Sequence, residues 1–209
     1  MKKSALAIGL ATALLSSVVM AHQAGDILIR AGGVAVSPTN VKNTANDQNP
    51  ALDLDVNTNA QLGLTATYLI TDNIGVELLA ATPFSHKITL GNTLVGKTKH
   101  LPPSLFLQYY FGSKESVARP YVGAGVNYTT FFDEQEKLAG VTDLKLKDSW
   151  GVAVNAGVDI NVTDNFFVNA SIDYAKIKTK ATFKLGGVEH SQDVRLDPIV
   201  YFLGVGYRF

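Results

Sequence analysis

The sequence predicts an all-β protein, and more specifically an eight-stranded antiparallel up-and-down transmembrane β-barrel. Three observations lead to this fold class. Apolar residues occupy every second position in eight segments of the 209-residue chain, which is the spacing of strands with one apolar face. The links between these segments alternate between short and long. No segment after the N-terminal region holds the about 18 uninterrupted apolar residues of a membrane-spanning helix.

Residues 1–21 have the features of a cleaved secretory signal peptide. Lys2 and Lys3 form a positive start, residues 5–15 are apolar, and Val19-Met20-Ala21 offers small residues at the expected cleavage positions. A membrane anchor is the alternative, but the apolar run is shorter than the roughly 20 residues that a spanning helix needs. The chain is therefore expected to be exported.

The remaining chain, residues 22–209, has a length that suits a single barrel domain. It has no cysteine, which excludes a disulfide framework and a thiolate metal site. Lys and Arg number 18 and Asp and Glu also number 18, so no basic field indicates nucleic-acid binding. Export without cysteine is compatible with a bacterial envelope protein.

The first four expected strands are residues 26–36, 61–70, 74–82 and 104–111. In residues 61–70, five apolar side chains alternate with Gln, Gly and Thr. Residues 74–82 and 104–111 follow the alternation less cleanly, and polar links bound both segments. Each segment can therefore present one apolar face.

The last four expected strands are residues 121–132, 149–160, 166–175 and 194–209. The first three alternate strictly, and the fourth keeps its apolar positions up to Phe209, the final residue. Closure of a barrel requires the last strand to pair with the first. This pairing explains why the pattern continues to the end of the chain instead of fraying.

The links between the strands fall into two kinds. The short ones are residues 71–73, 112–119 and 161–165, and the long ones are residues 37–59, 85–99, 133–148 and 185–191. Short periplasmic turns at one rim and longer extracellular loops at the other are typical of outer-membrane barrels. Within the third long link, residues 134–139 could form a helical turn or a plain loop.

The two faces of each strand differ in chemistry. A soluble barrel or sandwich would point the apolar face inward, whereas a membrane barrel points it to lipid. The opposite face is rich in Gly, Ser, Thr, Asn and Gln, which suits the narrow interior of eight strands. It also carries charges that can pair across the lumen. We expect Arg30 or Arg208 to pair with Glu77, Asp159 or Asp173.

Aromatic residues support the lipid-facing assignment. Aromatics favour strands in general, but here they gather on the apolar face near strand ends, where membrane-interface girdles lie. Four prolines fall at the loop-side ends of strands, as expected at the edges of the spanning band. The aromatics are Tyr68, Tyr109, Phe111, Tyr128, Trp150, Tyr174, Tyr201, Tyr207 and Phe209, and the prolines are Pro83, Pro102, Pro103 and Pro198.

Five segments resemble the outer membrane protein W (OmpW) family. They are TDNIGVELLAATPF (71–84), RPYVGAGVNYTTFF (119–132), LKDSWG (146–151), VRLDP (194–198) and GYRF (206–209). The resemblance implies an outer-membrane barrel with a long, narrow and rather hydrophobic lumen. It also implies a role in helping small hydrophobic compounds to cross the outer membrane.

On the family pattern, Leu79 faces inward at a constriction, and the strand alternation independently puts it on the lumen face. Asp173 departs from the family pattern, since relatives carry a bulky apolar residue there, and this bears on how closed the lumen is. The expected channel-lining residues are Leu79, Phe106, Tyr110, Phe167, Asp173, Val200 and Phe202.

We therefore expect a passive path for small hydrophobic molecules. The alternative is a non-conducting structural or receptor barrel whose extracellular loops bind partners. A lipid-modifying enzyme needs a catalytic cluster, and Ser104 with His100 is the one pair that the sequence offers. The histidines are widely spaced, so no metal site is expected, although His86 and His100 could approach each other. No cofactor is expected. The expected partners are outer-membrane lipid, lipopolysaccharide and small hydrophobic ligands, with a monomer as the expected state.

Overall fold

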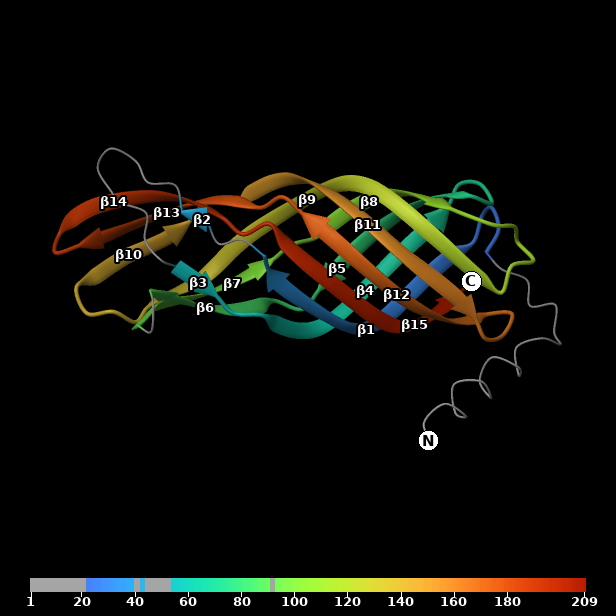
Figure 1. Ribbon diagram of the computed structural model, residues 1–209, viewed down its shortest axis with the longest axis horizontal. Coiled ribbons are helices and arrows are strands. Elements are labelled where there is room, and N and C mark those ends of the chain that lie inside the picture. The colour runs from blue at the N-terminus through green and yellow to red at the C-terminus, as the bar shows by residue number, and fades with distance from the viewer. Residues whose placement is uncertain (1–21, 40–41, 44–53, 91–92) are drawn as a thin grey trace, which may run out of the picture.

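The computed structural model describes residues 22–39, 42–43, 54–90 and 93–209 (Figure 1). In this part of the chain the regular elements are β-strands. No helix of the described residues is long and apolar enough to cross a membrane. The signal peptide expected over residues 1–21 lies outside the described residues.

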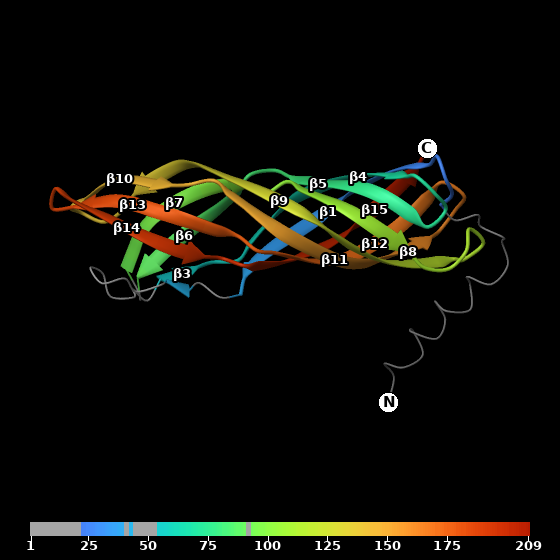
Figure 2. The ribbon, with the colours of Figure 1, turned by 90° about the horizontal axis from the view of Figure 1, so that it is seen from above.

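Eight strands form a closed antiparallel barrel, as the sequence predicts. Each strand pairs with the barrel strand that follows it in the chain, and β15 pairs with β1. The strands cross the elongated molecule at a tilt (Figures 1 and 2). They are β1 (Ile27–Pro38), β4 (Asn59–Leu69), β5 (Ile74–Ala81), β8 (Ser104–Tyr110), β9 (Ala118–Glu136), β11 (Ser149–Asn161), β12 (Phe166–Ala175) and β15 (Pro198–Arg208).

Closure of the barrel holds the C-terminus in place. The β1–β15 register runs from Leu28 opposite Arg208 to Pro38 opposite Pro198. Beyond it, the Phe209 amide donates to the Ile27 carbonyl at 3.0 Å, and the Ile27 amide donates to the Phe209 carbonyl at 3.2 Å. The terminal residue is therefore part of the sheet, as the alternating C-terminal pattern predicts.

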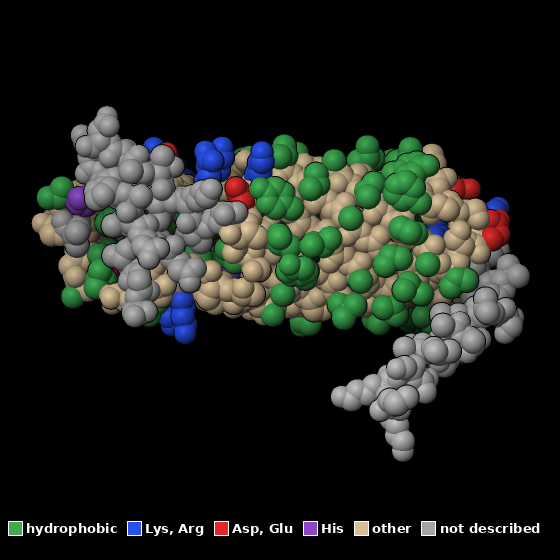
Figure 3. Space-filling view, viewed as in Figure 1, with side chains coloured by type: hydrophobic (Ala, Val, Ile, Leu, Met, Phe, Trp, Pro, Cys, Tyr) green, Lys and Arg blue, Asp and Glu red, His purple; other side chains and the backbone are tan. Residues whose placement is uncertain are grey.

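The apolar face of the barrel points outward and the polar face points inward. Val154 is 50% exposed, whereas its neighbour Asn155 is 5% exposed, and Trp150 is the most exposed large apolar side chain at 73%. Apolar side chains cover the barrel surface as a broad band (Figure 3). This arrangement excludes a soluble barrel with an apolar interior, because such a barrel would bury the residues that are exposed here.

Glycines on the lumen face leave room for large inward rings. A Cβ atom on Gly206 would lie 2.2 Å from the ring of Phe167, and one on Gly157 would lie 2.5 Å from the ring of Tyr121. Both distances are shorter than any van der Waals contact, so these positions require glycine. In the narrow lumen, large side chains are therefore accommodated opposite glycines, which have no side chain.

The loop side of the molecule is more ordered than the long links predict. β6 (Phe84–Leu90) and β7 (Thr93–Leu101) form a hairpin that pairs with the extended β9 and with β3 (Leu54–Val56). A second, four-stranded sheet contains β10, β13, β14 and β2, which are Val141–Leu146, Lys178–Leu185, Val188–Arg195 and Lys42–Asn43. The barrel therefore continues into a two-sheet extension on the loop side (Figure 1).

Three sequence expectations need correction in this extension. Residues 134–139 do not form the helical turn, and only residues 137–139 form a loop, because β9 continues through Glu136. The long link 185–191 is a short turn followed by β14. The last predicted strand, 194–209, is two strands separated at Leu196 and Asp197, where Asp197 has a φ of 32°.

These strands were missed because their polarity is inverted relative to the barrel. Along β13 the exposed side chains include Lys178, Lys180 and Lys184, while Thr179 is buried and Phe183 is half-buried. Outside the membrane, the outer face of a strand meets water and the inner face packs on apolar neighbours. Alternating apolar residues on the outer face therefore mark only the membrane-spanning part of each strand.

Candidate functional site

The turn-side end of the lumen is closed by a buried charge network, called here the base network: Arg30, Glu77 and Asp159. Arg30 is fully buried. Its Nη1 donates to Glu77 Oε2 at 2.8 Å, and its Nη2 donates to Asp159 Oδ2 at 2.6 Å. The same guanidinium also donates to the hydroxyl oxygens of Thr67 and Tyr110, at 2.7 and 2.9 Å. Every face of the arginine is thus occupied, as a buried charge requires.

Neutral polar side chains complete the surroundings of Glu77. Gln108 Nε2 donates to Glu77 Oε1 at 2.8 Å, and Asn155 Nδ2 donates to the same oxygen at 3.3 Å. The hydroxyl of Thr67 donates to Glu77 Oε2 at 3.1 Å. Residues from β1, β4, β5, β8 and β11 therefore meet in one network across the lumen.

His22 and Arg119 lie against the base network on its turn side. His22 is fully buried, and its Nε2 lies 3.1 Å from Asp159 Oδ2. Arg119 Nη1 donates to the His22 carbonyl at 2.6 Å. The His22 ring makes edge contacts with Phe167 and Tyr110, at centroid distances of 4.7 and 6.2 Å. These side chains close the lumen toward the turn-side rim.

Arg208 does not join the base network, contrary to the sequence expectation. Its Nη1 lies 3.7 Å from Asp26 Oδ2, and its Nη2 donates to the backbone carbonyl of Asp164. Arg208 pairs with Leu28 at the turn-side end of the barrel. From that position a long arginine side chain extends to the polar rim instead of into the closed interior.

Asp173 also stands apart from Arg30. It is buried, and it accepts a hydrogen bond from Ser171 Oγ at 3.4 Å. Among the residues that the structure describes, Arg30 forms its ion pairs with Glu77 and Asp159. Asp173 instead lines a cavity that lies farther toward the loop side, next to Leu79 and Val200.

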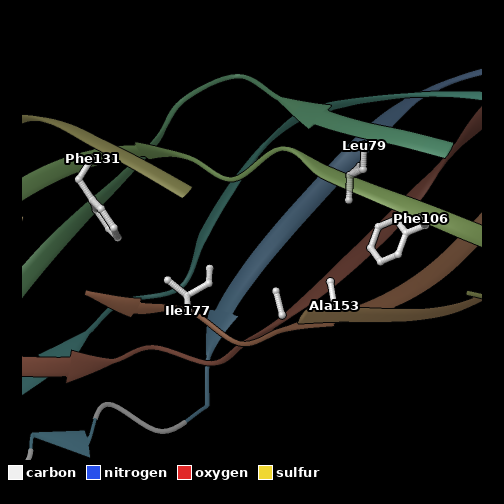
Figure 4. Packing of buried hydrophobic residues seen from close by; sticks show 6 residues of the cluster. Leu79, Phe106, Phe131, Ala153 and Ile177 are labelled. Atoms are coloured by element: carbon white, nitrogen blue, oxygen red, sulfur yellow. The ribbon is translucent and has the colours of Figure 1, made fainter. Parts of the chain in front are cut away.

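The apolar candidates divide among three buried clusters instead of one continuous track. Tyr110 and Phe167 pack around the base with Leu28, Leu69 and Tyr121. The other four lie in two clusters above them. Leu79 and Phe106 pack with Phe131, Ala153, Ala175 and Ile177 (Figure 4), while Val200 and Phe202 pack with Val34, Val36 and Phe84.

Two cavities with shared lining residues lie within these two upper clusters and beyond them on the loop side. The larger, called here the loop-side cavity, has a volume of about 250 Å³ and lies between the two sheets of the extension. The smaller, called here the narrow cavity, has a volume of about 30 Å³ and contacts Leu79 and Phe106. Val36, His100 and Ile177 line both, so the two cavities are neighbours.

The lining of the loop-side cavity is mostly apolar. Side chains of Phe131 and Ile88 come from the sheet that continues the barrel, and those of Leu144 and Phe183 come from the four-stranded sheet. A concave, mostly apolar site with a few polar groups is the usual form of a small-molecule site.

Comparisons with known proteins agree with this architecture. The family model described as OmpW family matches residues 23–209. The chain belongs to the OmpW family. Outer membrane protein W of Vibrio cholerae serotype O1 is 50% identical over the whole length of both chains. The crystal structure of OprG from Pseudomonas aeruginosa superimposes with a TM-score of 0.83 at 40% identity, covering 90% of this chain and 98% of OprG.

A more distant relative is named dibenzothiophene metabolism operon protein PahQ, from Pseudomonas aeruginosa. It is 32% identical over 164 residues, which cover 77% of this chain and 76% of the relative. Because its relatives are outer membrane proteins, the present chain is an outer-membrane barrel of the OmpW family. The turn-side rim therefore faces the periplasm, and the two-sheet extension faces the exterior.

In this OmpW-family barrel, two histidines meet in the wall of the loop-side cavity, and His100 also lines the narrow cavity. The rings of His86 and His100 stack at a centroid distance of 4.9 Å, and His86 Nδ1 lies 2.7 Å from the Asn57 carbonyl. Both histidines lie on β6 and β7, beyond the membrane-spanning strands. Burial lowers the pKa of His86, and burial together with the neighbouring His86 lowers the pKa of His100 to about 3. Both rings are therefore neutral near pH 7.

Within the described ranges, neither a metal site nor the Ser104–His100 catalytic pair considered from the sequence forms around these histidines. In the described part of the chain, no three metal-ligating side chains converge. Ser104 Oγ donates to the Pro102 carbonyl at 3.4 Å and accepts from Asn127 Nδ2 at 3.0 Å. His100 instead stacks on Phe84 and His86.

Sequence reasoning missed most of the loop-side cavity of this OmpW-family barrel. Its lining includes Leu138, Leu144, Phe183 and Gln192, which fall in or beside segments taken for loops. The available signal was the inverted alternation of residues 178–195, where charged and apolar side chains take turns.

Proposed function

We propose that this OmpW-family barrel provides a passive path for small hydrophobic molecules through the outer membrane. The observation that carries the proposal is the apolar loop-side cavity with the neighbouring narrow cavity beside Leu79. Transfer of a hydrophobic molecule from water to such a lining lowers its free energy. Since the path requires only binding and release, it needs no energy source.

The base network makes a periplasmic exit through the barrel axis unfavourable. An apolar molecule passing the base would have to separate Arg30 from Glu77 and Asp159, and buried ion pairs are strongly destabilised when one partner is lost. The proposed path therefore leaves the lumen through the wall, into the lipid.

The wall has a weak seam beside the narrow cavity, formed by residues 80–83 and 101–103. Pairing of β5 with β8 ends at Leu79 and Ser104, and pairing of β6 with β7 resumes at Phe84 and His100. Pro83, Pro102 and Pro103 lie in this seam, and proline has no N–H to donate. The seam is the place where the two strands can separate with the smallest loss of hydrogen bonds.

Each side of the seam remains attached to its outer neighbour. The Thr82 amide donates to the Leu62 carbonyl on β4 at 3.0 Å, and the Tyr128 amide on β9 donates to the Pro103 carbonyl at 3.0 Å. Separation at the seam would therefore leave the rest of the barrel paired. The narrow cavity contacts Ala80, Ala81 and Pro102, so it borders the proposed exit.

The name of one relative fits this chemistry. PahQ is named for an operon of dibenzothiophene metabolism, and dibenzothiophene is a flat, apolar aromatic molecule. A lining of Phe, Ile, Leu and Val side chains suits such a molecule.

Substitution of Leu79 tests the path. We expect Leu79→Arg to reduce the protein-dependent flux of N-phenyl-1-naphthylamine about tenfold or more, because a buried charge in the narrow cavity disfavours an apolar solute. The flux is measured as the rise of fluorescence in proteoliposomes whose outer leaflet contains lipopolysaccharide. Leu79→Met keeps the volume and polarity and should retain the flux.

Equal flux in the wild type, in both variants and in vesicles without protein would contradict the path. That result would favour the alternative function, a non-conducting structural or receptor barrel whose extracellular loops bind partners.

We further propose that lipopolysaccharide contacts the lysine-rich edge of the extension. Lys178 and Lys180 are exposed on β13, and Lys147 and Lys176 are exposed in the links before β11 and β13. The Lys147 amide donates to the Lys180 carbonyl at 3.1 Å. Basic side chains gather at the loop-side edge of the apolar band (Figure 3). Ammonium groups at this level suit the phosphates of the outer leaflet.

A further inference from the structure

Two buried polar groups in the loop-side cavity have no hydrogen-bond partner among the residues that the structure describes. His100 is 3% exposed and Gln192 is 4% exposed. Within the described residues, neither His100 Nδ1 nor Gln192 Nε2 has a hydrogen-bond partner. His100 comes from β7, in the sheet that continues the barrel, and Gln192 comes from β14, in the four-stranded sheet. Both side chains line the same cavity.

These two groups differ from other polar groups in the cavity wall. His86 Nδ1 lies 2.7 Å from the Asn57 carbonyl, and Thr179 Oγ1 donates to the Lys147 carbonyl at 2.6 Å. Buried polar atoms are nearly always hydrogen-bonded, because an unpaired one has lost its water without compensation. Two unpaired groups in one apolar cavity therefore indicate a ligand that supplies the missing partner.

We propose, on the basis of the proposed function, that the cavity selects apolar molecules that carry one uncharged hydroxyl or carbonyl group. Gln192 Nε2 donates to the oxygen of that group. His100 Nδ1 accepts from a hydroxyl in one tautomer and donates to an oxygen in the other. The hydrocarbon body of the ligand packs on Leu144, Phe131 and Phe183.

The size and charge of the cavity narrow the ligand class. An apolar cavity of about 150 Å³ holds one benzene ring, so about 250 Å³ suits a two-ring aromatic or a short alkyl chain. An ionised carboxylate or amine is disfavoured, because the described lining residues include no Lys, Arg, Asp or Glu to compensate its desolvation.

The test compares 1-naphthol with naphthalene, which share a shape and differ by one hydroxyl. Binding to the full chain in phospholipid nanodiscs is measured by equilibrium dialysis, with empty nanodiscs subtracted. We expect wild type to bind 1-naphthol about threefold to tenfold more tightly than naphthalene. Gln192→Leu and His100→Phe should each bring this ratio toward one while naphthalene binding stays within about twofold.

Leu144→Ala is the matched control, because it removes an apolar contact in the same cavity. It should weaken both probes by the same factor and leave their ratio unchanged. Gln192→Leu keeps the inference testable if His100→Phe disturbs the histidine stack, and heat-modified mobility on gels reports whether each variant is folded.

The outcomes distinguish a failure of the proposed selectivity from a failure of the proposed hydrophobic path. If wild type binds both probes equally, or if the ratio survives in a folded Gln192→Leu, the selectivity is wrong while the hydrophobic path stands. Equal affinities would also indicate that water alone pairs with the two groups. If wild type binds neither probe above the empty nanodiscs, the loop-side cavity is not a binding site for such molecules. Both the proposed selectivity and the proposed path would then be wrong.

Discussion

Arg30 is the residue on which the closed base depends. It is fully buried and pairs with two carboxylates, each of which has other donors around it. Its removal would leave Glu77 and Asp159 buried without their counter-ion. Breaking a buried pair in this way is far more damaging than breaking a surface pair, because the remaining charge has no water to replace its partner.

We predict that Arg30→Met lowers the free energy of unfolding by about 3–5 kcal/mol. Urea unfolding in phospholipid vesicles, followed by the fluorescence of the single tryptophan, Trp150, measures the change. Lys99→Met is the control, because Lys99 pairs with Asp133 at 2.7 Å with both side chains more than two-fifths exposed. It should cost about 1 kcal/mol or less. Equal losses in the two variants would contradict the role given to the base network.

At the scale of elements, the β6–β7 hairpin contains two stacked, neutral histidines. His86, His100 and His190 are the titratable side chains among those that line the loop-side cavity. Burial lowers the pKa of His86 and lowers the pKa of His100 to about 3. In an opened hairpin these groups would titrate near about 6.5. The stability from burying them neutral is therefore complete above about pH 6.5 and is lost as the pH falls toward the folded pKa.

We predict that the β6–β7 hairpin opens more readily in acid. For His100 alone, the opening equilibrium should rise about tenfold per pH unit between about pH 6.5 and pH 3. Hydrogen exchange of the backbone amides of residues 84–101, corrected for the intrinsic pH dependence, measures it. His100→Phe should remove most of this dependence and keep the ring stacking on Phe84. An unchanged profile in that variant would show that His100 is not the titrating group.

The β13–β14 hairpin presents lysines at the outer edge of the membrane band. We predict that Lys178→Glu with Lys180→Glu abolishes the increase in thermal stability that lipopolysaccharide gives to the wild type in vesicles. Each lysine near an anionic surface contributes about 1 kcal/mol, and reversal replaces attraction with repulsion. Lys114→Glu, in the short link 112–119 at the other rim, should keep the increase. A retained increase in the double variant would argue against lipopolysaccharide at this edge.

At the scale of the whole molecule, the barrel meets lipid and the two-sheet extension meets water. In the membrane the barrel turns its apolar face outward and buries a polar network, and beyond the membrane the same chain turns lysines outward and encloses an apolar cavity. The polarity reverses near Pro83, Pro102, Pro103 and Pro198, where the proposed seam also lies. On the proposed path, a hydrophobic ligand would meet apolar side chains as far as Leu79 and Phe106 and the polar base network beyond them, which would favour its release sideways into lipid.

Much of this architecture could be predicted from the sequence. The alternating residues identified the eight barrel strands, their closure through Phe209 and the outward face. They also placed Arg30, Glu77 and Asp159 on the inward face. These properties follow from a two-residue period, which assigns each side chain to one face of a strand, and from the chemical contrast between lipid and lumen.

Only the tertiary structure decided how inward residues from different strands meet. It joined Arg30 to Glu77 and Asp159 while leaving Arg208 at the rim, and it separated Tyr110 and Phe167 from Leu79. It also brought His100 and Gln192, 92 positions apart in the numbering, to one cavity. The physical reason is that periodicity fixes the face of a residue, whereas its height and its partner across the lumen depend on the tilt and register of the closed sheet.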